Sequence, residues 1–214
     1  MREKLWEVIY EDRALLVVRK AAGLAVESRK STVPDLEREL KNERARRGEA
    51  PEIFLINRLD QPVEGLVCAA KTKEAAAALS GQLRDGRMKK SYLACVTGEV
   101  PEKGTLTDWL LRDPKTNTSR VVPEGTKGAK RAELHFQRSG EQEAAVELVT
   151  GRHHQIRVQL SHAGMPIRGD RKYGGAPGNA LMLCACHLSF IHPESGERVT
   201  FMAEPSWKQT ETAE

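Results

Sequence analysis

The sequence has few cysteines and no long apolar run, and each shortage excludes a class of protein. The four cysteines among 214 residues are too few for a disulfide framework, and each lies in an apolar or strand-like run: Cys68, Cys95, Cys184 and Cys186. The longest wholly apolar runs, such as residues 75–79, fall far short of the ~20 residues that span a bilayer. The first residues also lack the apolar segment of a signal peptide. We therefore expect a reduced, cytoplasmic protein without a membrane partner.

Charge of one sign is only slightly in excess, with 34 Lys and Arg against 30 Asp and Glu. This balance does not by itself identify a partner. Basic residues nevertheless gather in three stretches: Arg84, Arg87, Lys89 and Lys90; then Lys127, Lys130 and Arg131; then Arg168, Arg171 and Lys172. Each stretch alone is typical of a solvated surface. A polyanion such as RNA becomes an expected partner only if the stretches converge in space.

The chain has no repeat, low-complexity tract or linker, so we expect one domain over residues 1–214, with a flexible tail at 206–214. Helices are predicted at 34–47, at 155–162, and from Thr72, a candidate N-cap, to about Arg84, with Gly86 as the stop signal. Short apolar or β-branched runs predict ten strands, at 6–10, 14–19, 53–56, 66–70, 89–97, 105–111, 131–137, 144–149, 181–191 and 198–203. Strands and helices do not alternate regularly, which favours an α+β fold with a mixed, largely antiparallel sheet.

A polar interruption between two apolar strands holds the first candidate for chemistry. Residues 57–62 read Asn-Arg-Leu-Asp-Gln-Pro, which places a cation, Arg58, two residues before a carboxylate, Asp60. A carboxylate held by rigid strands and open on one side suits a nucleophile or a base. The spacing alone favours a simpler reading, a turn in which Asp60 caps backbone N–H groups.

A second candidate is the stretch Gly-Arg-His-His-Gln-Ile-Arg-Val at residues 151–158. Arg152 and Arg157 lie five residues apart around the start of a predicted helix, where they suit a buried carboxylate or a phosphate, since helix N-termini attract anions. The alternative is a helix begun by a glycine, with solvated arginines. Arg157 lies about 100° from Ile156 and its apolar face, so spacing leaves open whether it points to solvent or into a cleft.

Together with four further stretches, these motifs resemble the RluA-type family of RNA pseudouridine synthases. The family's blocks His-Arg-Leu-Asp-x-x-Thr-Ser-Gly-Leu, Lys-x-Tyr-x-Ala and Gly-Arg-Thr-His-Gln-Ile-Arg-Val-His are similar to residues 57–66, 90–94 and 151–159. Further blocks are similar to residues 10–24, 164–174 and 183–193. The resemblance extends over roughly residues 6 to 205. Many members carry a small N-terminal RNA-binding domain, which we do not expect here because the similarity begins within the first ten residues.

The resemblance implies a fold and an activity. The fold would be that of a pseudouridine synthase, with flanking helices around a central cleft. The enzyme would be an isomerase that flips specific uridines out of ribosomal or transfer RNA, cleaves the glycosidic bond and reattaches the base through carbon 5. It would need no cofactor and no metal, and it would act on RNA rather than on DNA. Because the sequence has no heptad or large apolar stripe that favours assembly, we expect a monomer. RNA selection would then depend on the catalytic domain, including residues 29–47, or on a partner.

The resemblance also implies roles for particular residues. Asp60 would be the catalytic aspartate, Tyr92 the ring that stacks on the target uracil, and Arg157 the basic partner of Asp60. Arg58 would contact RNA and help to occupy the space left by the extruded base. Further RNA contacts are implied for four residues: Lys90, Arg152, His154 and Gln155.

Departures from the family pattern keep two alternatives open. Asn57 replaces a histidine, and Val63 and Glu64 replace a Thr-Ser pair. If it faced inward, Glu64 would repel phosphate or raise the pKa of Asp60. These departures favour a catalytically silent RNA-binding homologue as one alternative. The other is a zinc hydrolase, since several His and Cys residues offer zinc donors, although the adjacent pair at 153 and 154 rarely meets one ion.

Overall fold

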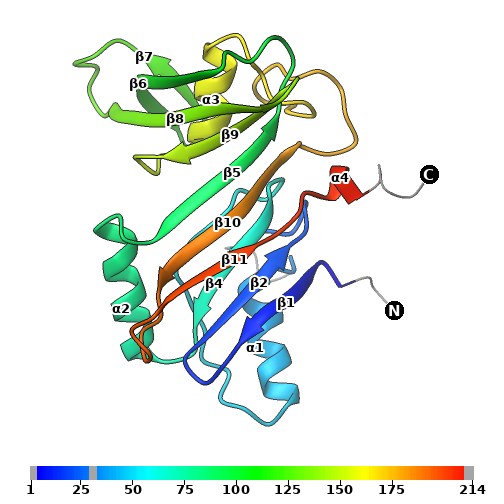
Figure 1. The fold of residues 1–214 in the computed structure, drawn as a ribbon, viewed down its shortest axis with the longest axis vertical. Helices are drawn as coiled ribbons and strands as arrows, with labels where there is room; N and C mark the ends of the chain where they lie inside the picture. Colours follow the sequence, from blue (N-terminus) through cyan, green and yellow to red (C-terminus); the bar gives the residue numbers. More distant parts are fainter. Residues whose placement is uncertain (1–3, 29–32, 210–214) are drawn as a thin grey trace. The chain divides into compact units, whose positions relative to one another are not determined.

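The computed structural model describes residues 4–28 and 33–209. The chain forms two compact units: unit 1 comprises Met1–Lys90 and Ala185–Glu214, and unit 2 comprises Ser91–Cys184. Each unit contains mainly antiparallel strands, with three helices in unit 1 and one in unit 2 among the described residues (Figure 1). Within the described residues, no helix has the length and apolar character to cross a membrane.

The sheet of unit 1 is formed by strands from both ends of the chain. Its strand order is β1-β2-β4-β10, with β3 pairing β4 and β11 pairing β10. The pairings β1–β2, β2–β4, β3–β4 and β10–β11 are all antiparallel. All seven residues of β4 are buried, which explains why its sequence is almost continuously apolar. The strands are β1 (Trp6–Glu11), β2 (Leu15–Lys20), β3 (Phe54–Leu55), β4 (Glu64–Ala70), β10 (Leu183–Ile191) and β11 (Arg198–Met202).

Local capping chemistry sets the ends of the helices of unit 1. In α1 (Leu36–Arg46), the side chain of Asp35 accepts a hydrogen bond from the backbone N–H of Arg38. In α2 (Lys73–Arg84), Thr72 accepts one from the N–H of Ala75 at 3.1 Å. These caps satisfy N–H groups that have no partner within a helix. The predicted start of α2 at Thr72 and its end at Arg84 are confirmed.

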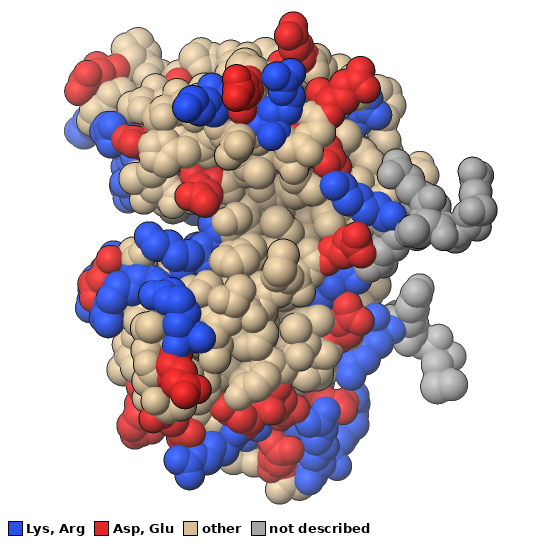
Figure 2. Space-filling model, in the orientation of Figure 1, with Lys and Arg blue, Asp and Glu red and all other residues tan. Residues whose placement is uncertain are grey.

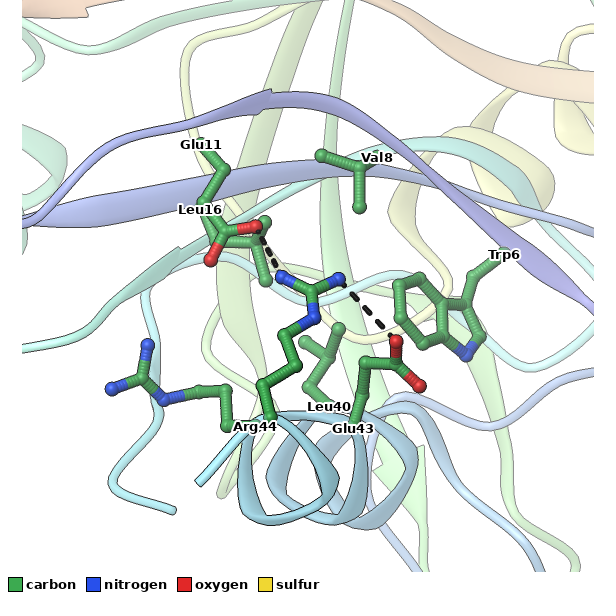
Figure 3. Close-up of a pocket in the computed structure, with 8 residues that line it drawn as sticks. Trp6, Val8, Glu11, Leu16, Leu40, Glu43 and Arg44 are labelled. Atoms are coloured by element: carbon green, nitrogen blue, oxygen red, sulfur yellow. Dashed lines mark hydrogen bonds and ion pairs between the residues drawn. The ribbon is translucent and has the colours of Figure 1, made fainter. Parts of the chain in front are cut away.

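Helix α1 packs against the β1–β2 hairpin. Trp6 and Val8 of β1 face Leu40 of α1 around a small hollow (Figure 3). At its edge the guanidinium of Arg47 lies 2.9 Å from a carboxylate oxygen of Glu11 and 3.3 Å from one of Glu43, so ion pairs link helix and strand. The contact buries the apolar side of a helix that is charged elsewhere.

Unit 2 is an antiparallel sheet with one helix against it. Its strand order is β5-β9-β8-β6-β7, and α3 (Gln155–His162) packs on β6 and β7 around Leu110, Ala132 and Val158. Strand β7 was not predicted, because it is only five residues long and its polar side chains leave a weak apolar pattern. The predicted helix at 155–162 is confirmed. The strands are β5 (Lys89–Cys95), β6 (Lys103–Asp113), β7 (Thr118–Val122), β8 (Lys130–Gly140) and β9 (Glu143–Leu148).

The C-terminal stretch that was expected to be a flexible tail begins with a short helix, α4 (Ser206–Gln209). Residues 210–214 lie outside the described residues, as do residues 29–32 of the charged segment that was expected to help select RNA. One domain over residues 1–214 stays a prediction.

Candidate active site

Asp60 lies in unit 1, in the loop that joins β3 to β4. The loop leaves the sheet after Ile56, whose N–H donates to the carbonyl of Cys68 at 2.9 Å. It closes with a tight turn, in which the N–H of Val63 donates to the carbonyl of Asp60 at 3.0 Å. Leu59 and Val63 are buried on either side, whereas Asp60 is only half-buried. Two apolar anchors therefore hold a short loop that presents one carboxylate.

Asn57 fixes the base of this loop, in the position where the family has a histidine. It is buried, its amide nitrogen donates to the carbonyl of Leu66 at 3.1 Å, and its amide oxygen accepts from the N–H of Cys68 at 2.7 Å. The side chain thus satisfies two backbone groups of β4 that would otherwise be buried without partners. Asn57 has a structural role in this chain.

A buried ammonium, that of Lys20, ties the loop to the end of β2. Lys20 is fully buried, and its Nζ donates to the carbonyls of Ala21, Leu24 and Gln61 at 3.0, 2.8 and 3.2 Å. Gln61 follows Asp60 directly, so the cation fixes the peptide next to the candidate catalytic carboxylate. Burial lowers the pKa of Lys20 to about 8, while the negative charges of Asp60 and Glu64 act in the opposite direction. Lys20 is thus a positioning residue that also places positive charge close to Asp60.

Glu64, the departure of greatest concern in the sequence, is buried and held by other groups. One carboxylate oxygen accepts from both the backbone N–H and the hydroxyl of Ser206, at 2.9 and 3.0 Å. The other lies 3.5 Å from the guanidinium of Arg19. Its charge is therefore partly balanced by an ion pair and by hydrogen bonds.

Arg58 points into solvent from the same loop. Its side chain is 72% exposed and forms an ion pair with Glu27 at 3.3 Å. An exposed pair of this kind contributes little to stability, so it can be exchanged for another anion at small cost. The predicted contact with RNA stays a prediction.

Tyr92 lies in β5 of unit 2, directly opposite Val146 of β9. Its side chain is buried, with 6% of its surface exposed. Strand pairing on β9 fixes the backbone on which the ring sits. Stacking on a uracil stays a prediction for this residue.

Arg157 lies in the first turn of α3 and is 4% exposed. Its Nε and Nη2 each donate to one carboxylate oxygen of Asp170, both at 2.8 Å, and Asp170 is itself 1% exposed. The ring of Tyr173 lies against the guanidinium, 5.1 Å from centroid to Cζ. A bidentate buried pair fixes the plane and direction of the guanidinium. The alternative in which Arg157 is solvated is wrong, because its guanidinium is buried and bound to Asp170.

The polar residues before Arg157 are largely engaged within unit 2. Nδ1 of His154 lies 2.7 Å from the hydroxyl of Tyr173. Burial lowers the pKa of His154 to about 3, with the positive charge of Arg157 as the next cause. The side chain of Gln155 accepts from Thr150 at 2.8 Å and donates to a backbone carbonyl of β8 at 3.0 Å. Contacts of His154 and Gln155 with RNA stay predictions.

Arg152 and Lys90 are more accessible than His154 and Gln155. Arg152 is exposed and donates from Nε to the carbonyl of Arg131 at 2.9 Å. Lys90 is half-buried, burial lowers its pKa, and its ammonium has no hydrogen-bond or ion-pair partner among the described residues. A desolvated cation without an anion is suited to binding one.

The structure brings some of the predicted residues together within each unit. Unit 1 holds Asp60 and Arg58 on one loop, and unit 2 holds Arg157 and His154 at the start of α3. Asp60 and Arg157 lie in different units, so their pairing stays a prediction. Three residues that support the site had no predicted role: Lys20, Asp170 and Tyr173. Asp170 had one signal, since a buried arginine requires an acidic partner.

The donor groups expected for the zinc alternative do not assemble. Within residues 4–28 and 33–209, no three His, Cys, Asp or Glu side chains gather as they would around a metal ion. His153 and His154 instead stack on each other, with ring centroids 3.8 Å apart. This part of the chain therefore offers no ligand set for a zinc hydrolase.

Comparison with known proteins gives consistent matches. The model of a family described as RNA pseudouridylate synthase matches residues 14–162. The RNA pseudouridine synthase YjbO of Bacillus subtilis is 31% identical over 202 residues, which cover 92% of this chain and 71% of that protein. Ribosomal large subunit pseudouridine synthase C of Escherichia coli is 34% identical over 207 residues, with 89% and 63% covered. Ribosomal large subunit pseudouridine synthase D of Neisseria meningitidis is 33% identical over 216 residues, with 92% and 57% covered. The chain thus spans less than two thirds of the last two relatives.

Solved structures of two human proteins have a similar fold. Human RNA Pseudouridylate Synthase Domain Containing 1 matches with a TM-score of 0.74 and 25% identity, over 93% of this chain and 83% of that one. Human RNA Pseudouridylate Synthase Domain Containing 4 matches with a TM-score of 0.73 and 21% identity, over 92% and 88%. The predicted α+β fold class is confirmed.

Proposed function

Because the chain belongs to the RNA pseudouridylate synthase family, we propose that it converts uridine to pseudouridine in RNA, with Asp60 as the catalytic carboxylate. The observation that carries the proposal is the loop of Asp60, anchored by buried Leu59 and Val63 and fixed from below by the ammonium of Lys20. A rigid loop holds a reacting group in place before substrate arrives, which is where much of an enzyme's rate advantage originates.

The chemistry requires little beyond a carboxylate, an enclosed site and retention of the free base. The bond from C1′ of ribose to N1 of uracil breaks, the base turns, and a bond forms from C1′ to C5. The proton on C5 leaves to solvent and N1 gains a proton, so that the product is an isomer of the substrate. Asp60 supplies the carboxylate for cleavage, either as a nucleophile or as a base. The target must first leave its stack, at a cost of a few kcal/mol, and the face of Tyr92 would offset about 1–3 kcal/mol of this by stacking.

Arg157 would serve this reaction as the basic partner of Asp60. Its bond to Asp170 supports this role, because two of the five N–H donors of Arg157 bind Asp170 and thereby fix the direction of the guanidinium. Lys20 and Arg157 would then both place positive charge beside Asp60.

The RNA substrate would be that of the large ribosomal subunit, since relatives that match most of this chain are named for that activity. Contacts to the RNA backbone would come from Arg58, Lys90 and Arg152. Lys and Arg side chains also gather where α2 ends and β5 begins (Figure 2). There Arg84, Arg87 and Lys89 are exposed, so the surface attracts phosphate. The other two basic stretches lie in unit 2, and their convergence with this one stays a prediction.

The silent RNA-binding alternative has lost much of its basis. It depended on Asn57, Val63 and Glu64, and each has a structural role: Asn57 bonds β4, Val63 is a buried anchor, and Glu64 bonds Ser206. The packing of unit 1 therefore accounts for all three departures from the family pattern.

Tritium release tests the proposal directly. A transcript of large-subunit ribosomal RNA carrying tritium at uridine C5 should lose tritium to water in the presence of the protein, because C5 exchanges its proton for the bond to C1′. Asp60→Asn keeps the size and polarity of the side chain, so it should abolish release and leave RNA affinity within about twofold of the wild type. Affinity without release from the wild-type protein would support the silent homologue instead.

A further inference from the structure

Three separate segments of unit 2 meet at Asn117, in the turn between β6 and β7. The backbone carbonyl of Asn117 accepts from Nζ of Lys172 at 2.8 Å. Its side-chain oxygen lies 3.4 Å from Nη2 of Arg112 and 3.2 Å from Nε2 of His153. Asn117, an exposed residue, thereby joins its own turn to three segments: the end of β6, the residue pair before α3 and the segment after Asp170.

The two cations in this cluster are not neutralised. Among the described residues, neither Arg112 nor Lys172 forms an ion pair with a carboxylate. Asp113 accepts the backbone N–H of Lys115 at 2.9 Å, and both oxygens of Asp170 are bonded by Arg157. The polar partners of Arg112 and Lys172 are instead the side-chain oxygen and the backbone carbonyl of Asn117. These neutral groups orient a cation without cancelling its charge.

The positive charges of this cluster affect a histidine inside unit 2, His154. Burial is the largest cause of the low pKa of His154, and the positive charges of Arg157, Lys172 and Arg112 all lower it further. A neutral histidine held near several cations indicates a local excess of positive charge. Such an excess at an exposed position attracts anions.

Backbone strain is also concentrated here. Among the described residues, Asn117 and His154 are the two non-glycine residues with positive φ, at 50° and 54°. His153 links them, since it precedes His154 and contacts Asn117. Ser119 holds His153 in place, with its hydroxyl 2.9 Å from Nδ1. Left-handed backbone costs about 1 kcal/mol or more at such residues and recurs where a ligand is gripped.

We infer that Arg112, Asn117 and Lys172 form a clamp for a phosphodiester group of the RNA backbone. The guanidinium and the ammonium supply charge, and the amide nitrogen of Asn117, whose donors have no protein partner among the described residues, supplies hydrogen bonds. Arg112 presents a planar fork suited to phosphate oxygens. The identity of the RNA rests on the proposed function, whereas the clamp itself requires only a phosphate chain.

Single substitutions separate the clamp from general surface charge. Lys172→Gln and Arg112→Gln should each weaken binding of a large-subunit ribosomal RNA transcript about tenfold. Each should also reduce the slope of log K against log salt by about 0.7–0.9, the value for one phosphate contact. Lys115→Gln is the matched control, because it removes a cation from the same exposed turn outside the clamp. Its effect on affinity should stay within about twofold.

Asn117→Gly tests the role of the amide without threatening the fold. Glycine accepts φ of 50° without strain and keeps the carbonyl that bonds Lys172, so the melting temperature should not fall. RNA affinity should still weaken several-fold, and KM for tritium release should rise while kcat stays within about twofold. A variant with wild-type affinity, or a Lys115→Gln variant as weak as Lys172→Gln, would overturn the clamp.

Failure of the clamp and failure of the proposed function give different results. Affinity and its salt dependence are measured by filter binding and do not require turnover. Absence of tritium release from wild type, with the expected losses of affinity in the variants, would refute the enzyme and keep the clamp. Normal tritium release from wild type, with unchanged RNA affinity in all variants, would refute the clamp and keep the enzyme.

Discussion

Replacing Lys20 by Met removes a fully buried ammonium and preserves most of the side-chain volume. In the folded protein, burial lowers the pKa of Lys20 from 10.5 to about 8. The unfolded chain exposes the same group to water, where it keeps its ordinary value. This lowering of the pKa corresponds to about 3 kcal/mol, since a tenfold change in proton affinity is about 1.4 kcal/mol.

The sign of the effect follows from which state holds the proton. Below pH 8 both states bind it, so the folded protein carries the whole cost of the buried charge. Between about pH 8 and 10.5 the unfolded chain keeps a proton that the folded protein has lost, so stability rises with pH. The free energy of unfolding of wild type, minus that of Lys20→Met, should therefore climb by about 3 kcal/mol across this window.

Urea unfolding followed by tryptophan fluorescence measures this difference at a series of pH values. Other titrating groups are common to both proteins and cancel in the subtraction, provided that they do not contact residue 20. A difference that stays flat from pH 7 to 10.5 would refute the assignment of a strained, buried cation.

The same variant should also lower turnover. It loses the hydrogen bond to the carbonyl of Gln61, the residue after Asp60, and with it the positive charge beneath that loop. We expect kcat for tritium release to fall about tenfold or more, with RNA affinity unchanged, because Lys20 lies away from solvent. Normal kcat would show that the loop holds its shape without the ammonium.

Three further substitutions test packing and contacts in the two units. Gly65→Ala should lower the free energy of unfolding by about 3 kcal/mol, because a Cβ there would lie 2.4 Å from a backbone oxygen of β10. The control Gly86→Ala, also at positive φ but in open space, should lower it by only about 1–2 kcal/mol. Equal losses in urea unfolding would contradict the close approach of Gly65 to β10. Arg157→Lys should lower stability by about 1–3 kcal/mol, since a lysine cannot bond both oxygens of buried Asp170; unchanged unfolding would show that the bidentate geometry is dispensable. Tyr92→Phe should keep most tritium release and Tyr92→Ala should lose about tenfold or more, while equal rates would exclude stacking.

Sequence predicted the parts of the fold that depend on neighbours in the chain. Thr72 caps α2 and Gly86 follows its end in left-handed backbone, because both signals act within one helical turn. The strands at 6–10 and 14–19 were also predicted, and they pair as the β1–β2 hairpin. Strand β7 was missed because its pairing with β6, rather than its own sequence, makes it a strand.

The site was predictable to the same limited extent. A motif located Asp60, but no pattern in the sequence shows that Lys20 donates to three backbone carbonyls, since carbonyls belong to every residue. The direction of Arg157 was equally open, because its partner Asp170 lies 13 residues away in the chain. Long-range partners decide whether a polar side chain is buried or solvated.

The split make-up of unit 1 constrains how the protein emerges from the ribosome. Unit 2 is one continuous stretch, so all of its strands are available as soon as residue 184 has been synthesised. β4, by contrast, must wait for β10, its neighbour in the sheet, which is synthesised only after all the strands of unit 2. A nascent chain cut short before β10 would leave one side of an apolar strand unpaired, and such an edge invites aggregation. Correct folding of unit 1 should therefore depend on the synthesis of β10, more than a hundred residues after β4.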